Sequence, residues 1–175
     1  MRLIEATRAL EEAYIEYIEE WEKSGEKIVP MASSRNGLTY DELLEEWAYY
    51  KSDRAYEKGF VPATTYYLVD DNEHIKGCLN FRHTLNDHLL REGGHIGYGV
   101  RPSERGNGYA ELMVKLAMDK AVVLGLDKVL ITCNDTNVGS YRTIEKLGGV
   151  LENKVDTDGG VMRRYWLTVG EKNDS

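Results

Sequence analysis

The chain has 175 residues, of which 42% are apolar and 30% charged, an ordinary composition for one soluble globular domain. Its formal net charge of −8 argues against nucleic acid as a partner, because nucleic-acid-binding proteins usually carry a basic face. Cys78 and Cys133 form no paired framework, the chain opens without a signal-like apolar stretch, and no segment is long enough for a membrane span, so we expect a cytoplasmic protein.

The spacing of apolar residues predicts a single α/β domain over residues 1–175. Thr39 has the side chain of an N-cap, and Gly125 is suited to the end of a helix. The expected helices cover residues 8–23, 39–51, 109–124 and 137–147. The expected strands cover residues 3–6, 64–69, 75–83, 95–100, 129–133, 150–155 and 162–169, and residues 86–91 form a short helix or a loop.

The most informative segment joins the strand at 95–100 to the helix at 109–124. A glycine-rich turn before a helix leaves backbone N–H groups unpaired, and these groups together with the helix dipole form an anion site. Arginine adds a planar fork of donors that suits phosphate. We therefore expect a ligand bearing a pyrophosphate. The residues of this segment, the phosphate loop, are Arg105, Gly106, Asn107, Gly108, Tyr109 and Ala110.

Two common phosphate motifs do not fit the phosphate loop. A Walker loop requires a Lys-Ser/Thr pair after its glycines, and the dinucleotide fingerprint requires a third glycine that is missing after Gly108. The pattern Arg/Gln-x-x-Gly-x-Gly/Ala is met by Arg105, Gly108 and Ala110. On this motif the chain resembles the GNAT superfamily of acyl-CoA-dependent N-acetyltransferases. A nucleotide-binding protein that uses the same loop is the weaker alternative.

The resemblance extends over nearly the whole order of elements and implies a mixed, mostly antiparallel α/β sheet with helices on both faces. It also implies that the strands at 95–100 and 129–133 splay apart, with the pantetheine arm of acetyl-CoA bonded to the strand edge at Val100. Asn137 and Ser140 match the family segment that faces the pantetheine. From the residues alone, Asn137 is equally suited to be the N-cap of its helix.

The catalytic groups are less clear from the sequence. In the family, a tyrosine in the last helix often acts as general acid, but Ile144 occupies that position here. Tyr141, three residues earlier, is the replacement candidate. His95 is the first candidate for a general base, since histidine titrates near neutral pH, although a structural role at the strand start is the alternative. Glu92, His83 and Tyr98 are lesser candidates.

Other polar and aromatic residues have simpler interpretations. Arg82, His83, Asp87 and His88 are candidates either for a polar substrate rim or for ordinary loop positions. The two histidines lack the spacing of a zinc site, so no metal is expected. Several tyrosines are candidates either to line an amine pocket through cation–π contacts or to pack in the core. These tyrosines are Tyr49, Tyr50, Tyr56, Tyr66 and Tyr67.

Together these features predict an N-acetyltransferase that transfers acetyl from acetyl-CoA to a primary amine by direct attack in a ternary complex. Its partners would be an amine-bearing small molecule or peptide and, through exposed strand edges, a second copy of the chain. The alternative is a non-catalytic acyl-CoA-binding regulatory module, which the isoleucine at position 144 favours. The identity of the acceptor is not encoded in any motif.

Overall fold

The computed structural model describes residues 1–170 and contains every expected helix and strand. The helices are α1 (Glu11–Ser24), α2 (Tyr40–Lys51), α3 (Tyr109–Val123) and α4 (Val138–Lys146). The strands are β1 (Arg2–Glu5), β2 (Ala63–Val69), β3 (Ile75–Arg82), β4 (Ile96–Val100), β5 (Lys128–Asn134), β6 (Val150–Thr157) and β7 (Gly160–Thr168). Short 3₁₀ turns cover Arg8–Leu10, Met31–Ser33, Asp53–Lys58 and Pro102–Glu104, and a π-helical turn covers Leu89–Gly93.

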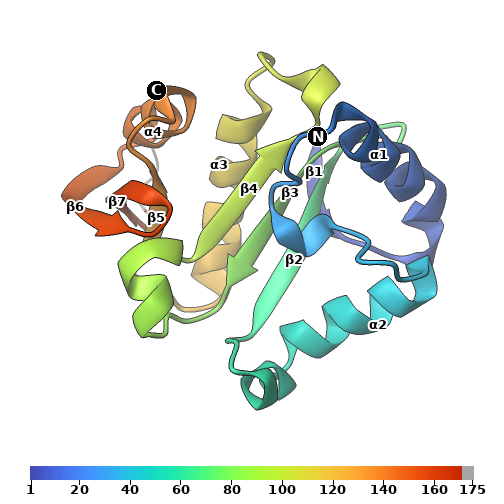
Figure 1. Cartoon of the computed structure of the whole chain (residues 1–175), viewed down its shortest axis with the longest axis horizontal. Coiled ribbons are helices and arrows are strands. Elements are labelled where there is room, and N and C mark those ends of the chain that lie inside the picture. Colours follow the sequence, from blue (N-terminus) through green and yellow to red (C-terminus); the bar gives the residue numbers. More distant parts are fainter. Residues whose placement is uncertain (171–175) are drawn as a thin grey trace.

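The strands form two antiparallel sheets that meet between β4 and β5. The larger sheet has the order β1-β2-β3-β4 and the smaller sheet the order β5-β7-β6. They touch where the His95 N–H donates to the Leu130 carbonyl, at an N···O distance of 2.8 Å. In Figure 1, β4 begins beside the smaller sheet and its arrowhead points away from it. The break between β4 and β5 is the expected splay, and the predicted α/β fold class is confirmed.

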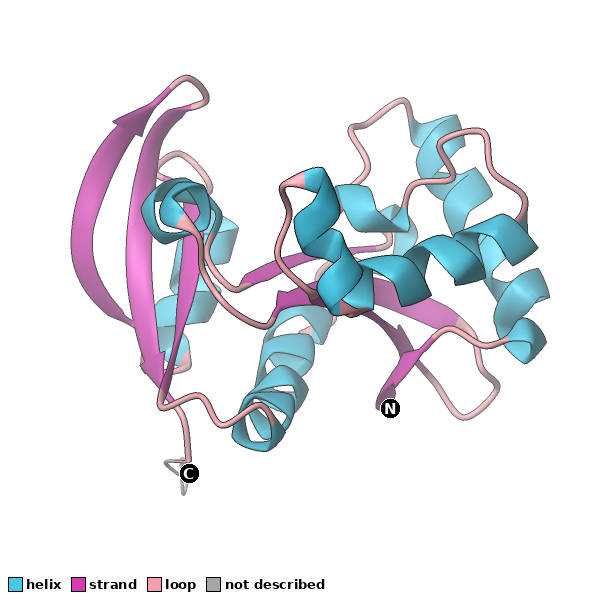
Figure 2. Cartoon of the chain, turned by 90° about the horizontal axis from the view of Figure 1, so that it is seen from below, coloured by secondary structure: helices cyan, strands magenta, loops and turns pink. Residues whose placement is uncertain are grey.

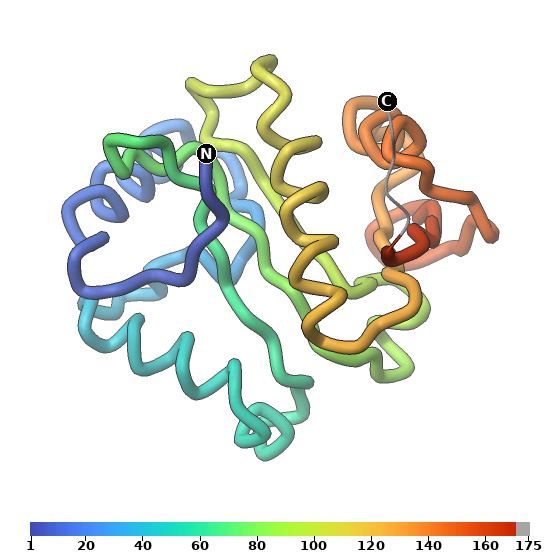
Figure 3. Tube along the Cα trace, turned by 180° about the vertical axis from the view of Figure 1, so that it is seen from behind, coloured from blue at the N-terminus to red at the C-terminus, as the bar shows by residue number. Residues whose placement is uncertain are grey.

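Helices cover both faces of the larger sheet (Figure 2). α3 crosses one face, as Figure 3 shows from behind, and packs with α4 on a core that includes Leu79, Phe81 and Ile144. α1 and α2 cover the opposite face, where Tyr14, Tyr17 and Tyr67 form edge-to-face and tilted ring contacts. Each strand of this sheet is therefore covered on both sides, and alternate residues face α3 or the α1–α2 layer.

Local sequence signals explain the ends of two helices. Thr39 caps α2, because its side chain accepts from the Glu42 N–H while the Glu42 carboxylate accepts from the Thr39 N–H. α1 ends at Gly25, whose φ of 72° is left-handed and favours glycine. The expected helix from residue 8 begins as a 3₁₀ turn and becomes α-helical only at Glu11.

Candidate functional site

The candidate site begins at the edge of β4 that has no partner strand. Hydrogen bonds from Arg82 N to His95 O and from Arg101 N to Lys76 O fix the register with β3. Because backbone groups alternate along an antiparallel pair, the N–H and C=O groups of Tyr98 and Val100 point away from β3. This edge offers the backbone groups that the predicted pantetheine contact at Val100 requires. The contact itself stays a prediction.

A side-chain hydrogen bond joins β4 to α4 at the place where the two sheets diverge. The Tyr98 hydroxyl on β4 lies 3.0 Å from the Ser140 hydroxyl on α4. Burial raises the pKa of Tyr98, while the hydrogen bond with Ser140 lowers it by a smaller amount. Tyr98 is therefore a protonated phenol at neutral pH. No local sequence signal marks Tyr98 as a site residue, because its partner Ser140 lies 42 positions along the chain.

The phosphate loop has the backbone that an anion site needs. Gly106 and Gly108 have φ values of 81° and 76°, a left-handed conformation that favours glycine at both positions. Gly108 is the N-cap of α3, and its carbonyl accepts the first helical bond from the Leu112 N–H, at 3.1 Å. The N–H groups of Tyr109 and Ala110 consequently precede the first helical hydrogen bond. The loop is exposed from residue 105 to 108, with the Asn107 amide donating to the Glu104 carbonyl.

The Arg105 guanidinium already has a carboxylate partner. Its Nη1 donates to both oxygens of Glu26, at 3.1 and 3.2 Å, and the group lies over the Trp21 ring. Arg101, just before the loop, is paired in the same way with Glu20 and Glu16 of α1. The pair with Glu26 is half-exposed, so exchange of that carboxylate for a phosphate costs little. The phosphate role of Arg105 stays a prediction.

Asn137 caps the start of α4, which is one of the two roles expected for it; the other is contact with the pantetheine. Its Oδ1 accepts from the Ser140 N–H at 3.2 Å, and Asn137 is the N-cap of the helix. The Asn137 amide nitrogen has no hydrogen bond to a described residue and stays available as a donor. Ser140 faces Tyr98, as described above. Their predicted contacts with the pantetheine are not tested by these interactions.

His95 is buried and bonded in a way that weighs against a role as general base. Its Nδ1 accepts from the Leu130 N–H at 2.9 Å, which leaves the ring proton of the neutral imidazole on Nε2. In this tautomer Nε2 can donate a proton but not accept one. Burial, with a smaller effect of the nearby Arg82 charge, lowers the pKa of His95 to about 4. The contacts make His95 a link between β4 and β5. They also explain why β4 begins at Ile96 and not at residue 95.

The position at which the family often has the general acid is filled here by an apolar side chain. Ile144 is fully buried in the core. The Tyr141 ring is covered by the Arg163 guanidinium, whose central carbon lies 3.7 Å from the ring centroid. The structure therefore brings Tyr98, and not Tyr141, into hydrogen-bonding contact with Ser140. The acid role of Tyr141 stays a prediction.

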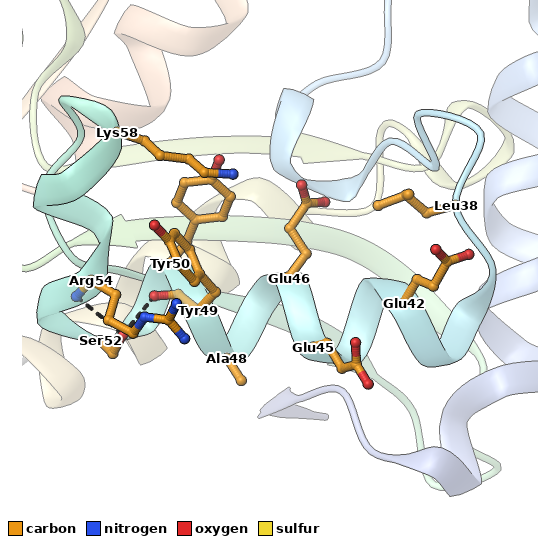
Figure 4. Close-up of a pocket in the computed structure, with 10 residues that line it drawn as sticks. All are labelled: Leu38, Glu42, Glu45, Glu46, Ala48, Tyr49, Tyr50, Ser52, Arg54 and Lys58. Carbon is orange, nitrogen blue, oxygen red and sulfur yellow. Dashed lines mark hydrogen bonds between the residues drawn. The ribbon is translucent and has the colours of Figure 1, made fainter.

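A shallow pocket of about 680 Å³ lies along α2 and the turn that follows it, on the part of the fold that covers β2 (Figure 4). Arg54 and Lys58 lie over the Tyr49 ring, at 4.7 and 5.1 Å from its centroid, so the chain's own cations occupy that aromatic face. Tyr67 is fully buried in the core. The pocket is lined by Leu38, Glu42, Glu45, Glu46, Ala48, Tyr49, Tyr50, Ser52, Arg54 and Lys58.

Within residues 1–170, no three histidine, cysteine, aspartate or glutamate side chains are grouped as metal ligands. No helix in that range combines the length and apolar character needed to cross a bilayer.

Comparison with known families identifies the class of the protein. Residues 5–150 match the family described as the acetyltransferase (GNAT) domain. This match covers most of the chain, and the chain belongs to the GNAT acetyltransferase family. A search of curated proteins found no match.

Solved structures share the fold at low sequence identity. Spermidine N-acetyltransferase from Vibrio cholerae, solved with CoA and spermine, is 16% identical, covers 96% of this chain and 95% of its own, and has a TM-score of 0.64. The ribosomal-protein-S5-alanine acetyltransferase from Vibrio fischeri is 18% identical over 97% of this chain and 92% of its own, with a TM-score of 0.63. A putative GNAT-family acetyltransferase from Bordetella pertussis is 20% identical over 94% of this chain and 93% of its own, with a TM-score of 0.60.

Proposed function

We propose that the protein transfers an acetyl group from acetyl-CoA to a primary amine, by direct attack within a ternary complex. The observation that carries this proposal is the unpaired edge of β4, which lies between the phosphate loop and α4. The edge presents the backbone groups of Tyr98 and Val100, and the loop presents the first N–H groups of α3. The loop suits the pyrophosphate of a long ligand, and the strand edge suits an attached arm that carries amides.

Two parts of acetyl-CoA, the pyrophosphate and the pantetheine arm, have a proposed position. The phosphate loop, from Arg105 to Ala110, binds the pyrophosphate through backbone N–H groups and the arginine. The β4 edge at Val100 bonds the pantetheine on one side, and the Asn137 amide approaches it from α4. A related GNAT structure contains CoA and spermine, which supports a cofactor and an amine in one fold of this kind.

Direct attack is favoured because neither cysteine of the chain is suited to carry the acetyl group. Cys133, at the end of β5, is buried, and burial raises the pKa of its thiol. In the proposed reaction, the amine nitrogen bonds to the acetyl carbon and the carbon–sulfur bond breaks. The Tyr98 phenol, held by Ser140, supplies a proton to the departing thiolate. The acetylated amine releases its proton to solvent, and Tyr98 takes one back from solvent.

The first test is a set of thermal-shift titrations with acetyl-CoA, CoA, ATP and NAD. Ligand at a hundred times its dissociation constant should stabilise the protein by about 2.7 kcal/mol. Stabilisation by both CoA species alone supports the proposed cofactor, whereas stabilisation by ATP or NAD without CoA would support the nucleotide-binding alternative. CoA binding without acceptor-dependent thiol release would instead support the regulatory module. A cytoplasmic location and a homodimer, for which β6 offers an exposed edge strand, belong to the same proposal.

A further inference from the structure

Arg82 at the end of β3 is a partly buried cation without a carboxylate partner. Its Nη1 donates to the carbonyls of Gly93 and Gly94, at 3.0 and 3.2 Å. Among residues 1–170, no carboxylate oxygen lies within 4.0 Å of this guanidinium, and its Nε and Nη2 donors have no hydrogen-bond acceptor. Three of its five N–H groups, one on Nε and two on Nη2, are therefore available to a ligand.

This lack of a partner is unusual in a chain with 30 acidic residues. The other arginines that lack a carboxylate partner are Arg91 and Arg142, and both are exposed. Every remaining arginine forms an ion pair with aspartate or glutamate. Because a buried charge without a counter-charge is unfavourable, an unpaired and partly buried arginine indicates a site that an anionic group occupies during function.

The guanidinium lies over the face of β4 beside the proposed reaction centre. A Cβ placed on Gly97 would lie 3.5 Å from Arg82 Nη2 and 3.9 Å from the Pro30 Cβ. Gly97 directly precedes Tyr98, whose backbone belongs to the proposed acetyl-CoA edge. The face over Gly97 is thus bounded by Arg82 and by the connection between α1 and α2.

The neighbouring strand positions continue this face with polar side chains. Asn80 pairs with Gly97 across β3 and β4, and its amide donates to the Thr65 hydroxyl at 3.2 Å. The side-chain amide oxygen of Asn80, Oδ1, has no hydrogen-bond partner among the described residues. Arg82 and Asn80 together offer donors for a carboxylate and an acceptor for an ammonium or amide group on one side of β4.

We propose that Arg82 binds a carboxylate of the acceptor, so that the protein acetylates the amine of an amino carboxylic acid and not a polyamine. The inference rests on the proposed function, since it places the acceptor at the β4 face opposite α3. A polyamine offers no anion to the guanidinium and brings like charge toward it. An amino acid brings a carboxylate that Arg82 can bind through two parallel hydrogen bonds.

Matched acceptors test this inference in the intact protein. Each amino acid is compared with the amine that lacks its carboxylate, such as lysine with cadaverine and ornithine with putrescine, and spermidine is added. We expect kcat/KM for the best amino acid to exceed that of its decarboxylated partner by about tenfold or more. Preference for a diamine or for spermidine would overturn the inference and leave the proposed function standing.

Variants assign the preference to Arg82. Arg82→Gln should reduce the ratio of the two kcat/KM values to near one, and Arg82→Lys should retain part of it. Arg91→Gln is the matched control, because Arg91 also donates to a backbone carbonyl, that of Asp156, and has no carboxylate partner. The ratio is measured within one variant, so a loss of stability that lowers both rates does not affect it. An unchanged ratio in Arg82→Gln would overturn the inference.

A binding readout covers the case in which no acceptor of the panel is turned over. The CoA-loaded protein is heated with each amino acid and with its decarboxylated partner. Stabilisation by the amino acid that is lost in Arg82→Gln supports the inference, and the absence of any stabilisation by the amino acids overturns it. If CoA itself does not raise the unfolding temperature of the protein, the proposed function is contradicted, and this result is distinct from a failure of the inference about Arg82.

Discussion

The Tyr98 hydroxyl lies 3.0 Å from the Ser140 hydroxyl and joins β4 to α4 at the place where the two sheets diverge. Ser140 belongs to the segment expected to face the pantetheine, and Tyr98 belongs to the strand edge expected to bond it. The two hydroxyls therefore lie beside the proposed path of the thioester. Ile144 stands where the family often has a tyrosine, and we propose this pair as the source of the phenolic proton.

Tyr98→Phe tests the acid role. The variant removes only the hydroxyl, so we expect kcat to fall by about 10²-fold with little change in KM for acetyl-CoA. Because burial raises the pKa of Tyr98, the wild-type rate should decline only at strongly alkaline pH, where the phenol loses its proton. Steady-state kinetics over pH 6 to about 10 make this comparison. Tyr141→Phe is measured beside it, and a larger loss in that variant would return the acid role to Tyr141.

Gly108→Trp tests the phosphate loop. A tryptophan here fills the space before the α3 N-terminus and adopts an unfavourable left-handed backbone, so CoA binding should be lost in calorimetry. Gly125→Trp is the control, because Gly125 has a φ of 73° and equally open surroundings at the other end of α3. Both variants should lose similar stability, while only the first loses CoA. Normal CoA affinity in Gly108→Trp would refute the assignment of the loop.

Two glycines on β4, Gly97 and Gly99, should differ sharply in how much stability is lost when each is replaced by alanine. A Cβ on Gly99 would lie 2.1 Å from the Val29 carbonyl oxygen, so Gly99→Ala must displace the connection between α1 and α2. We expect a loss of about 1–3 kcal/mol in the free energy of unfolding. Gly97→Ala, whose Cβ would meet nothing closer than 3.5 Å, should lose less. Urea unfolding of both variants measures the difference, and equal losses would contradict this packing.

The buried His95 predicts a loss of stability in acid. Its pKa is about 4 in the folded state and 6.5 without burial, so the unfolded state binds the proton first as the pH falls. Stability is therefore complete above pH 6.5 and decreases towards pH 4, by up to about 3 kcal/mol. The unfolding free energy, measured in urea at pH 7 and pH 5, should fall less in His95→Gln than in the wild type. An equal fall in both proteins would remove His95 as the cause.

The same variant separates the two roles considered for His95. A structural link between β4 and β5 predicts reduced stability with kcat per folded molecule largely retained. A general base predicts a large fall in kcat at neutral pH with unchanged CoA affinity. The latter result would require the bond from the Leu130 N–H to Nδ1 to break during turnover.

The sequence predicted the helices, the strands and the glycine-rich turn before α3, because these depend on local spacing and on glycine. It did not reveal the role of His95, since the ring accepts from an N–H group 35 residues away. Arg82 had only a weak signal, as one of four polar residues considered for a substrate rim, because its significance lies in the absence of a carboxylate partner among residues 1–170. Tyr98 was visible only as a minor candidate, and its distance from Ser140 depends on how β4 and β5 diverge.

Acceptor-dependent release of CoA thiol is the measurement that tests the central claim most directly. The intact protein is incubated with acetyl-CoA and a panel of amino acids and amines, and the acetylated product is identified by mass spectrometry. The account predicts thiol release only in the presence of an acceptor, with one acetyl group added at an amine for each thiol released. CoA binding with no acceptor-dependent release across the panel would contradict it and indicate a binding module.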